Sequence, residues 1–344
     1  MKAIIMAGGK GKRLRAVSGT APKPMVMLCG RPIMEHIVLL LRECGINDIC
    51  VTLGYRPEVI KEYFGDGSKW GVRLSYKTEE QPLGTAGGVK SCADFYGDED
   101  FLVISGDAAC DFDLKELISE HEKHSPAATL ALYQHSDPLR YGLCLCDREG
   151  CIRSFIEKPD WGRVVTDLVN TGIYVLSPRA MALVPEGREY DFGKELFPEL
   201  LRRGERLLGV PCSGYWCDIG TPRSYYQCCA DALAGKLRIS TAGGFCPETA
   251  PDCSGETKTQ EPAERISCRD RARLMNRLSS VFLELGATAE DGLRICGEGY
   301  ELCFRAAPDA LAVCVSASAE DTELASELAL SAAQLVKDIE KRLD

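Results

Sequence analysis

The sequence lacks the features that mark several large classes of protein. No run of apolar residues approaches the roughly 20 needed to cross a membrane. Basic residues are fewer than acidic ones, 41 against 51, and the net charge of -10 argues against nucleic acid as a general partner. No two of the 18 cysteines have CxxC spacing, so a zinc ribbon is excluded. The start has no signal-peptide pattern, because its apolar stretch is short and glycines follow it.

These absences lead us to expect a cytoplasmic protein with no membrane and no nucleic-acid partner. Most cysteines lie in apolar runs, and we expect them to be small buried thiols rather than disulfides. The composition, 45% hydrophobic and 27% charged, is ordinary for a globular protein, and 344 residues suggest about two domains.

Strand-like and helix-like patterns alternate along the first part of the chain. Strands are expected at 3–7, 48–53, 72–77 and 101–105, with helices between them at 32–44, 57–64 and 85–93. This rhythm predicts an α/β fold, a Rossmann-like and mostly parallel mixed sheet with helices on both faces. Four closely spaced strands, 127–135, 141–146, 151–157 and 170–176, indicate antiparallel pairs added to that sheet. Helices are expected near 191–203 and 222–234.

The composition changes near Gly235. Residues 235–265 are rich in Thr, Pro, Gly and Glu, and we interpret them as a flexible linker. The sequence therefore predicts a first domain at 1–234 and a small C-terminal α+β domain at 266–344. The last helix of that domain is marked by apolar residues recurring every three or four positions: Leu324, Leu328, Ala332, Leu335, Ile339 and Leu343.

A glycine-rich loop, MAGGKGKRL, follows the first strand. It lacks the Gly-Lys-Ser/Thr of a Walker loop, since Arg13 follows Lys12, and it lacks the third glycine of the dinucleotide fingerprint, since Leu14 stands there. Glycines that admit a ligand to the backbone, with several cations beside them, suit a polyphosphate. A tight turn with solvated cations is the alternative, and these residues alone leave both open.

Four further stretches carry polar groups at the ends of expected elements. They are PLGTAGG at 82–88, Asp107 after the buried strand, EKP at 157–159, and WCDIGTP around Asp218. Each has an ordinary structural explanation when taken alone: a turn, a helix cap or a solvated lysine. His121 and His124, three residues apart among charged residues, are interpreted as a solvated helix end rather than a metal pair.

Taken together and in order, MAGGKGKRL, PKP, PLGTAG, GD, EKP, VNTGIY and WCDIGTP resemble the sugar-phosphate nucleotidylyltransferases, over residues 1 to about 234. Within that family YFGDGSKWGV, YGLCLCDREGCIRSFIEKP and GYWCDIGTPRSYYQ resemble mannose-1-phosphate guanylyltransferases, especially the bacterial form fused to a phosphomannomutase. The resemblance implies that a nucleoside triphosphate and a sugar 1-phosphate, with Mg²⁺, give a nucleotide sugar and pyrophosphate. Members often form homo-oligomers, which the sequence leaves open.

The resemblance also implies roles for individual residues. Asp107 and Asp218 hold the metal, Arg13 lies nearest the leaving pyrophosphate, and Lys23 neutralises the α-phosphate region. The nucleotide-binding set is Met6, Ala7, Gly8, Gly9, Gly11, Lys12, Arg13, Glu79 and Gly84, of which Glu79 and Gly84 lie near the base edge. Sugar hydroxyls are contacted by Gly142, Glu157 and Asn170, and the sugar's phosphate by Lys158. Lys12 and the stretch RAVSG at 15–19 depart from the usual pattern but remove no group that the chemistry needs.

The tail, 266–344, resembles the C-terminal domain of α-D-phosphohexomutases. Their phosphate loop has the form R-P-S-G-T-E-P, whereas this chain has RAAPDAL at 305–311, without the Ser, Gly and Thr donors. We therefore expect no mutase activity and a tail that serves packing, assembly or regulation.

Three functions stay open at this point. The first joins GTP and mannose 1-phosphate into GDP-mannose or a related GDP-sugar. The second joins glucose 1-phosphate with UTP or dTTP by the same chemistry. The third is a non-catalytic regulatory subunit that binds a nucleotide sugar. A degenerate subunit is expected to lose Arg13, Lys23, Asp107 or Asp218, and all four are present.

Overall fold

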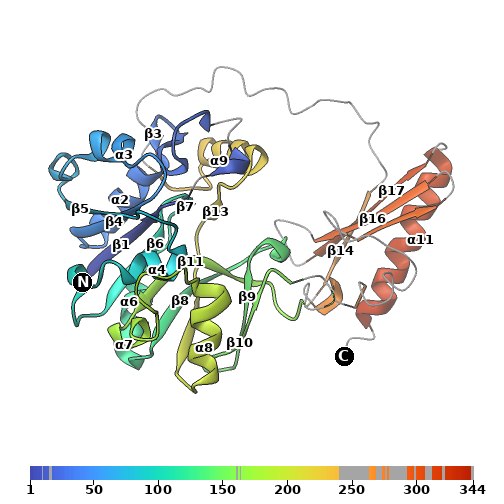
Figure 1. Cartoon of the computed structure of the whole chain (residues 1–344). Coiled ribbons are helices and arrows are strands. Elements are labelled where there is room, and N and C mark those ends of the chain that lie inside the picture. The colour runs from blue at the N-terminus through green and yellow to red at the C-terminus, as the bar shows by residue number, and fades with distance from the viewer. Residues whose placement is uncertain are drawn as a thin grey trace. The chain divides into compact units, whose positions relative to one another are not determined.

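The computed structural model describes residues 1–9, 11–14, 18–159, 162, 164–239, 263–268, 273–275, 277–278, 293–297, 300–306, 312–319 and 322–341 (Figure 1). The chain divides into two compact units. The first comprises Met1–Tyr133, Cys146–Phe155 and Asn170–Ala250, and the second comprises Gln134–Leu145, Ile156–Val169 and Pro251–Asp344. The expected linker falls largely outside the described residues, and strand β14 (Ala263–Ser267) begins inside its final part.

Nine strands of the described chain form one sheet. Along its path the order is β10-β9-β11-β6-β1-β4-β5, while β8 pairs with both β11 and β12. The pairs β1–β4, β1–β6, β4–β5 and β8–β12 are parallel, and β11 runs antiparallel to β6. The expected mostly parallel mixed sheet is therefore confirmed. Its strands are β1 (Lys2–Ala7), β4 (Asp48–Leu53), β5 (Arg73–Thr78), β6 (Phe101–Ser105), β8 (Ala128–Gln134), β9 (Gly142–Cys146), β10 (Ile152–Glu157), β11 (Leu168–Leu176) and β12 (Leu207–Pro211).

The centre of this sheet is buried on both sides. The successive residues Ala3, Ile4 and Ile5 of β1 are fully buried although their side chains alternate between the two faces. Helices supply the covering layers (Figure 1). They are α2 (Ile33–Glu43), α3 (Pro57–Phe64), α4 (Gly84–Lys90), α5 (Ala93–Tyr96), α6 (Leu114–His124), α7 (Pro178–Met181), α8 (Phe197–Arg202) and α9 (Pro222–Leu233).

Several expected elements differ in detail. The helix expected at 85–93 is interrupted after Lys90, and α5 begins separately at Ala93. The helix expected near 191–203 begins with a π-helical segment, Phe192–Leu196, before α8. His121 is fully buried, so the interpretation as a solvated helix end is wrong for this residue. Its Nδ1 lies 2.8 Å from Thr129 Oγ1, which explains how a polar ring is accommodated in the core.

The structure also contains short elements that the sequence did not predict. They are the 3-10 turns η1 (Lys12–Leu14), η2 (Lys23–Met25), η3 (Ser68–Trp70) and η4 (Pro138–Arg140), and the strands β2 (Met27–Leu28), β3 (Arg31–Pro32), β7 (Ala108–Cys110) and β13 (Trp216–Asp218). Strand β7 pairs antiparallel with β13 in a separate two-stranded sheet.

The second unit contains a four-stranded antiparallel sheet in the order β14-β17-β16-β15. Along β17 (Ala312–Ala319) the buried residues Val313, Val315 and Ala317 alternate with half-buried ones, so one face of this sheet is covered. The small C-terminal α+β domain is confirmed. Its other elements are β15 (Leu293–Gly297), β16 (Tyr300–Ala306) and α11 (Thr322–Lys341), which packs on β17 and β14.

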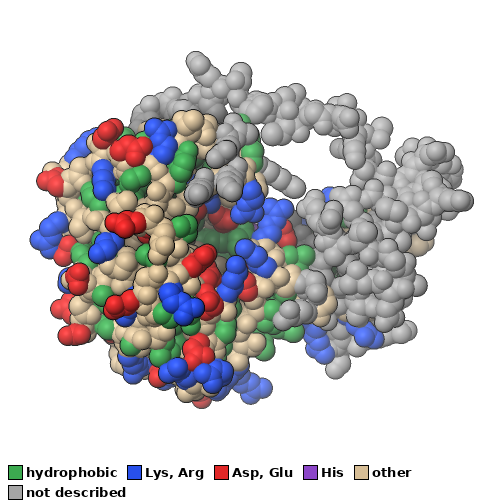
Figure 2. Space-filling view, in the orientation of Figure 1, with side chains coloured by type: hydrophobic (Ala, Val, Ile, Leu, Met, Phe, Trp, Pro, Cys, Tyr) green, Lys and Arg blue, Asp and Glu red, His purple; other side chains and the backbone are tan. Residues whose placement is uncertain are grey.

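The cysteines and the charged surface residues lie as the composition predicts. The cysteines whose surroundings the structure describes are free thiols, all buried or half-buried, as expected. In the described chain, no helix combines the length and the apolar character that a membrane crossing needs. Figure 2 shows one face, on which acidic and basic side chains are interspersed over the described residues, so the negative charge is spread over this surface.

Candidate active site

The carboxyl ends of β1 and β6 meet at the centre of the sheet. Met6 pairs with Ser105, and the amide of Gly106 donates to the Met6 carbonyl over 2.9 Å. A Cβ on Gly106 would lie 2.9 Å from that carbonyl oxygen, so only glycine allows the approach. The glycine loop after β1 and Asp107 after β6 therefore share the edge where ligands of parallel sheets bind.

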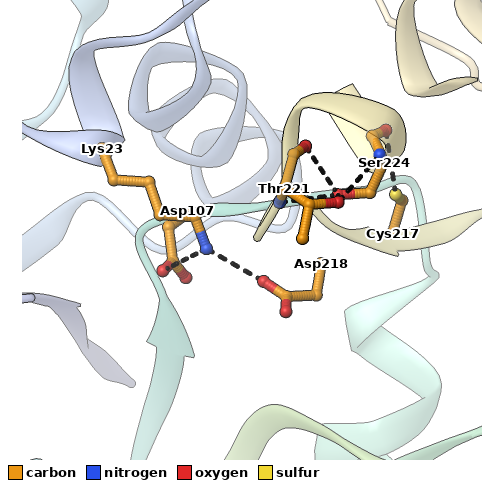
Figure 3. Close-up of polar contacts among 6 residues, drawn as sticks. All are labelled: Lys23, Asp107, Cys217, Asp218, Thr221 and Ser224. Carbon is orange, nitrogen blue, oxygen red and sulfur yellow. Dashed lines mark hydrogen bonds and ion pairs between the residues drawn. The ribbon is translucent and has the colours of Figure 1, made fainter. Parts of the chain in front are cut away.

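Strands β7 and β13 bring the second carboxylate to this edge. Asp218 pairs with Ala108, the residue directly after Asp107. The chain then turns through Gly220, whose amide donates to the Asp218 carbonyl over 2.8 Å. Helix α9 starts at once, because Thr221 and Ser224 cap it reciprocally and Pro222 occupies its first position (Figure 3). The sequence WCDIGTP thus encodes a strand end, a tight turn and a helix start, with Asp218 fixed between them.

Lys23 joins the two carboxylates. Its Nζ lies 2.7 Å from Asp107 Oδ2 and 2.9 Å from Asp218 Oδ1 (Figure 3). Prolines on both sides restrict the backbone of η2, and the lysine itself is buried, with 8% of its surface exposed. Burial alone lowers the pKa of the Lys23 ammonium, but the two carboxylates outweigh it and the pKa lies above its ordinary value. The site therefore holds a fixed positive charge.

Arg13, which follows the glycine loop, lies near Asp218 and Gly220. A Cβ on Gly220 would be 3.5 Å from Arg13 Nη2 and 2.9 Å from Asp218 Oδ2. Arg13 is exposed, while its neighbour Leu14 is fully buried and anchors η1. Lys12 also lies in η1, but its side chain falls outside the part of the chain that the structure describes.

Glu79, which follows β5, lies against the start of the glycine loop. Its Oε1 would be 3.3 Å from a Cβ on Gly8 and 2.6 Å from one on Gly88, so the carboxylate lies against both backbones. Its Oε2 accepts from the Leu83 amide over 3.2 Å. Burial raises the pKa of this carboxyl above its ordinary value, and the Leu83 hydrogen bond only partly opposes that effect. Gly84 begins α4 directly afterwards.

The expected sugar-side residues are divided between the two units. Asn170, in the first unit, donates from Nδ2 to the Tyr174 hydroxyl and accepts from the Gly172 amide. In the second unit, Gly142 begins β9, and Glu157 and Lys158 follow from β10. Lys158 has a left-handed φ of 43°, its amide donates to the Tyr141 carbonyl, and its Nζ lies 3.8 Å from Glu157 Oε1.

The residues that the structure brings together in the first unit are Arg13, Lys23, Asp107 and Asp218. Glu79, which follows β5, lies against Gly8 of the glycine loop. Asp107 and Asp218 offer carboxylate oxygens, and each side chain is about one third exposed, 33% and 31%. Within the described chain no group of three or more His, Cys, Asp or Glu could hold a metal ion by itself. Two carboxylates nevertheless suit Mg²⁺, which is commonly held by one or two carboxylates together with substrate phosphates.

Comparison with known proteins identifies the family. Residues 2–235 match the family described as nucleotidyl transferase. The chain belongs to this family. The chain is 35% identical over 251 residues to a UTP–glucose-1-phosphate uridylyltransferase of Synechocystis, and this alignment covers 69% of this chain and 65% of that protein. It is also 35% identical over 234 residues to the mannose-1-phosphate guanylyltransferase of Mycobacterium tuberculosis, covering 68% and 65%. The chain thus spans slightly less than two thirds of each relative.

Solved structures support the same fold. A putative glucose-1-phosphate thymidylyltransferase from Bacillus anthracis, in complex with a sucrose, has a TM-score of 0.63 and 28% identity, covering 70% of this chain and 97% of that one. HddC from Yersinia pseudotuberculosis complexed with GMP-PN has a TM-score of 0.58 and 28% identity, covering 67% and 99%.

The sequence did not indicate one pair of residues that lies next to this site. Thr85 and Asp191 are in contact although 106 positions separate them. The composition of either stretch alone does not reveal the contact, because only the assembled sheet brings α4 and the π-helical segment together. The one local signal is the glycine-rich start of α4, in which Gly84 and Gly87 lie against residues 188–190.

Proposed function

We propose that this chain is a sugar-1-phosphate nucleotidylyltransferase, which joins a nucleoside triphosphate and a sugar 1-phosphate and releases pyrophosphate. The observation that carries the proposal is the contact of Lys23 with both Asp107 and Asp218, beside the glycine loop at the carboxyl ends of parallel strands. Membership of the nucleotidyl transferase family supports it. We assign the activity to residues 1–234.

The chemistry needs alignment and charge compensation rather than a general base. A sugar phosphate is already an anion at neutral pH and can attack the α-phosphorus in line. In this proposal Asp107 and Asp218 hold Mg²⁺, which supplies compensation for charge that develops on the phosphates. Lys23 and Arg13 provide fixed cations near the α-phosphate and the leaving pyrophosphate, and Glu79 with Gly84 contacts the base.

For the sugar side we propose Gly142, Glu157, Asn170 and Lys158, of which Lys158 binds the phosphate. Lys158 suits this role because its side chain is 63% exposed and can meet an anion from solvent.

We propose GTP and mannose 1-phosphate as the substrates, giving GDP-mannose or a related GDP-sugar. The relatives named mannose-1-phosphate guanylyltransferase, from Mycobacterium tuberculosis at 35% and Candida albicans at 36% identity, support this choice. The second candidate is glucose 1-phosphate with UTP or dTTP, which is favoured by the name of the Synechocystis relative at the same 35% identity.

The test is pyrophosphate release by purified full-length protein with Mg²⁺. GTP, ATP, UTP, dTTP and CTP are each combined with mannose 1-phosphate, glucose 1-phosphate and a manno-heptose 1-phosphate. Release confined to GTP with a manno-configured sugar supports the first pair. Release with UTP or dTTP and glucose 1-phosphate supports the second. Folded protein that binds a nucleotide sugar but releases no pyrophosphate with any pair contradicts the proposal and supports a regulatory subunit.

A further inference from the structure

The turn that opens α4 is bonded through its backbone to a distant segment of the first unit. The amides of Ala86 and Gly87 both donate to the Tyr190 carbonyl, over 2.9 and 3.0 Å. In return the Tyr190 amide donates to the Leu83 carbonyl over 2.9 Å. The first amides of a helix have no partner within the helix, so Tyr190 satisfies groups that are otherwise left to solvent.

A side-chain contact reinforces these backbone bonds. The Thr85 hydroxyl donates to Asp191 Oδ2 over 3.0 Å, and Thr85 Oγ1 itself accepts from the Phe192 amide over 3.0 Å. Asp191 Oδ1 meanwhile accepts from the Gly193 and Lys194 amides and caps the π-helical segment. The two oxygens of one carboxylate thus connect the start of α4 to the start of a π-helix, a rare element that is often found at functional sites.

The two segments approach so closely that side chains cannot be added between them. A Cβ on Gly84 would lie 2.6 Å from the Tyr190 carbonyl oxygen, and one on Gly87 would lie 2.6 Å from the Arg188 carbonyl oxygen. Gly84 also has a φ of +70°, in the left-handed region. These glycines of PLGTAGG therefore allow close contact with residues 188–190.

The Leu83–Gly87 turn is also bonded to Glu79. The Leu83 amide donates to Glu79 Oε2, and Glu79 Oε1 lies against Gly8 and Gly88. The path from Asp191 through Thr85 and Leu83 to Glu79 is therefore a continuous series of contacts that ends at the glycine loop.

We infer that Thr85 and Asp191 are positioning residues that fix the Leu83–Gly87 turn and, through it, the groups that meet the nucleotide base. The inference rests on the proposed function for the identity of the ligand. It assigns these two residues an effect on nucleotide binding and none on the sugar phosphate, because their contacts lead to Glu79 and Gly8.

The experiment compares full-length Thr85→Val, Thr85→Ser and Asp191→Asn with the unchanged protein. Isothermal titration with GTP and UTP gives nucleotide Kd values, and steady-state kinetics gives kcat and both KM values. Thr85→Val keeps the branched shape and removes the hydroxyl, so we expect the Kd and KM for the nucleotide to rise about tenfold. We expect the KM for the sugar phosphate to stay within about twofold, Thr85→Ser to behave as the unchanged protein, and Asp191→Asn to lie between.

A matched control is Ser68→Ala. The Ser68 hydroxyl donates to Asp66 Oδ1 over 2.7 Å in an exposed turn of the same unit, and we expect its loss to change none of these constants. An unchanged nucleotide Kd in Thr85→Val would overturn the inference, as would an equal rise in both KM values. If the unchanged protein binds nucleotide but releases no pyrophosphate, the proposed function fails while the Kd comparison still tests the inference. An unchanged protein that binds no nucleotide overturns both.

Discussion

Lys23 and Asp218 are 195 positions apart in the sequence, yet Nζ and Oδ1 lie 2.9 Å apart. The same ammonium contacts Asp107 on the other side. These three residues come from a proline-flanked 3-10 turn, the β6–β7 turn and the end of β13. The cluster therefore depends on the pairing of β7 with β13, and it assembles only in the folded first unit.

The first prediction concerns the two carboxylates. Asp218→Asn keeps the size of the side chain but removes the charge that the proposed mechanism needs for Mg²⁺. We expect kcat for pyrophosphate release to fall roughly 10²-fold or more while the circular dichroism spectrum shows that the fold is kept. Asp107→Asn should behave in the same way.

Asp98→Asn is the control for that prediction, because Asp98 is exposed in the turn before β6. Near-normal turnover of Asp218→Asn would remove this residue from the proposed metal site. An equal loss in Asp98→Asn would mean that the assay responds to charge in general.

The second prediction concerns stability at Lys23. Lys23→Met leaves two carboxylates facing each other without their shared cation, and breaking such a pair commonly costs about 3–5 kcal/mol. Since both carboxylates are about one third exposed, we expect the lower end of that range for the loss in unfolding free energy, measured by urea denaturation. Lys23→Met combined with Asp218→Asn should lose less than the sum of the single changes. Strict additivity in this cycle would show that the pair is not energetically coupled.

The third prediction concerns the C-terminal sheet. The strands β14, β15, β16 and β17 pair only with one another among the described strands, and the Lys23 cluster is built from residues before 240. We therefore expect protein truncated after Ile239 to keep most of its turnover. A truncated protein that is folded by circular dichroism but inactive would show that the tail completes the site.

The sequence was informative where a pattern is local. The strands at 48–53 and 101–105 and the helix at 57–64 were predicted with the bounds that the structure has, because buried parallel strands are continuous apolar runs. Strand β13 was not predicted, since WCD has no periodicity and depends on pairing with β7. The family resemblance implied that Asp107, Asp218 and Lys23 belong to one site. The direct contact of Lys23 with both carboxylates, and that of Thr85 with Asp191, required the tertiary structure.

The fourth prediction concerns pH and the buried His121. Burial lowers the pKa of this imidazole below 6.5, and the neighbouring Asp100 carboxylate only partly opposes that effect. The unfolded chain, with a pKa of about 6.5, therefore binds more protons than the folded one as the solution is acidified. The contribution of the neutral, buried His121 to the unfolding free energy is therefore fully present above pH 6.5. It is lost as the pH falls below 6.5, because protonation then favours the unfolded chain. We expect the urea-derived unfolding free energy to decline from pH 7.5 to 5.5, and to decline less steeply in His121→Gln. Comparing the two slopes isolates His121 from His36, whose pKa burial also lowers. Equal slopes would mean that His121 takes up its proton at the same pH in the folded and unfolded chains.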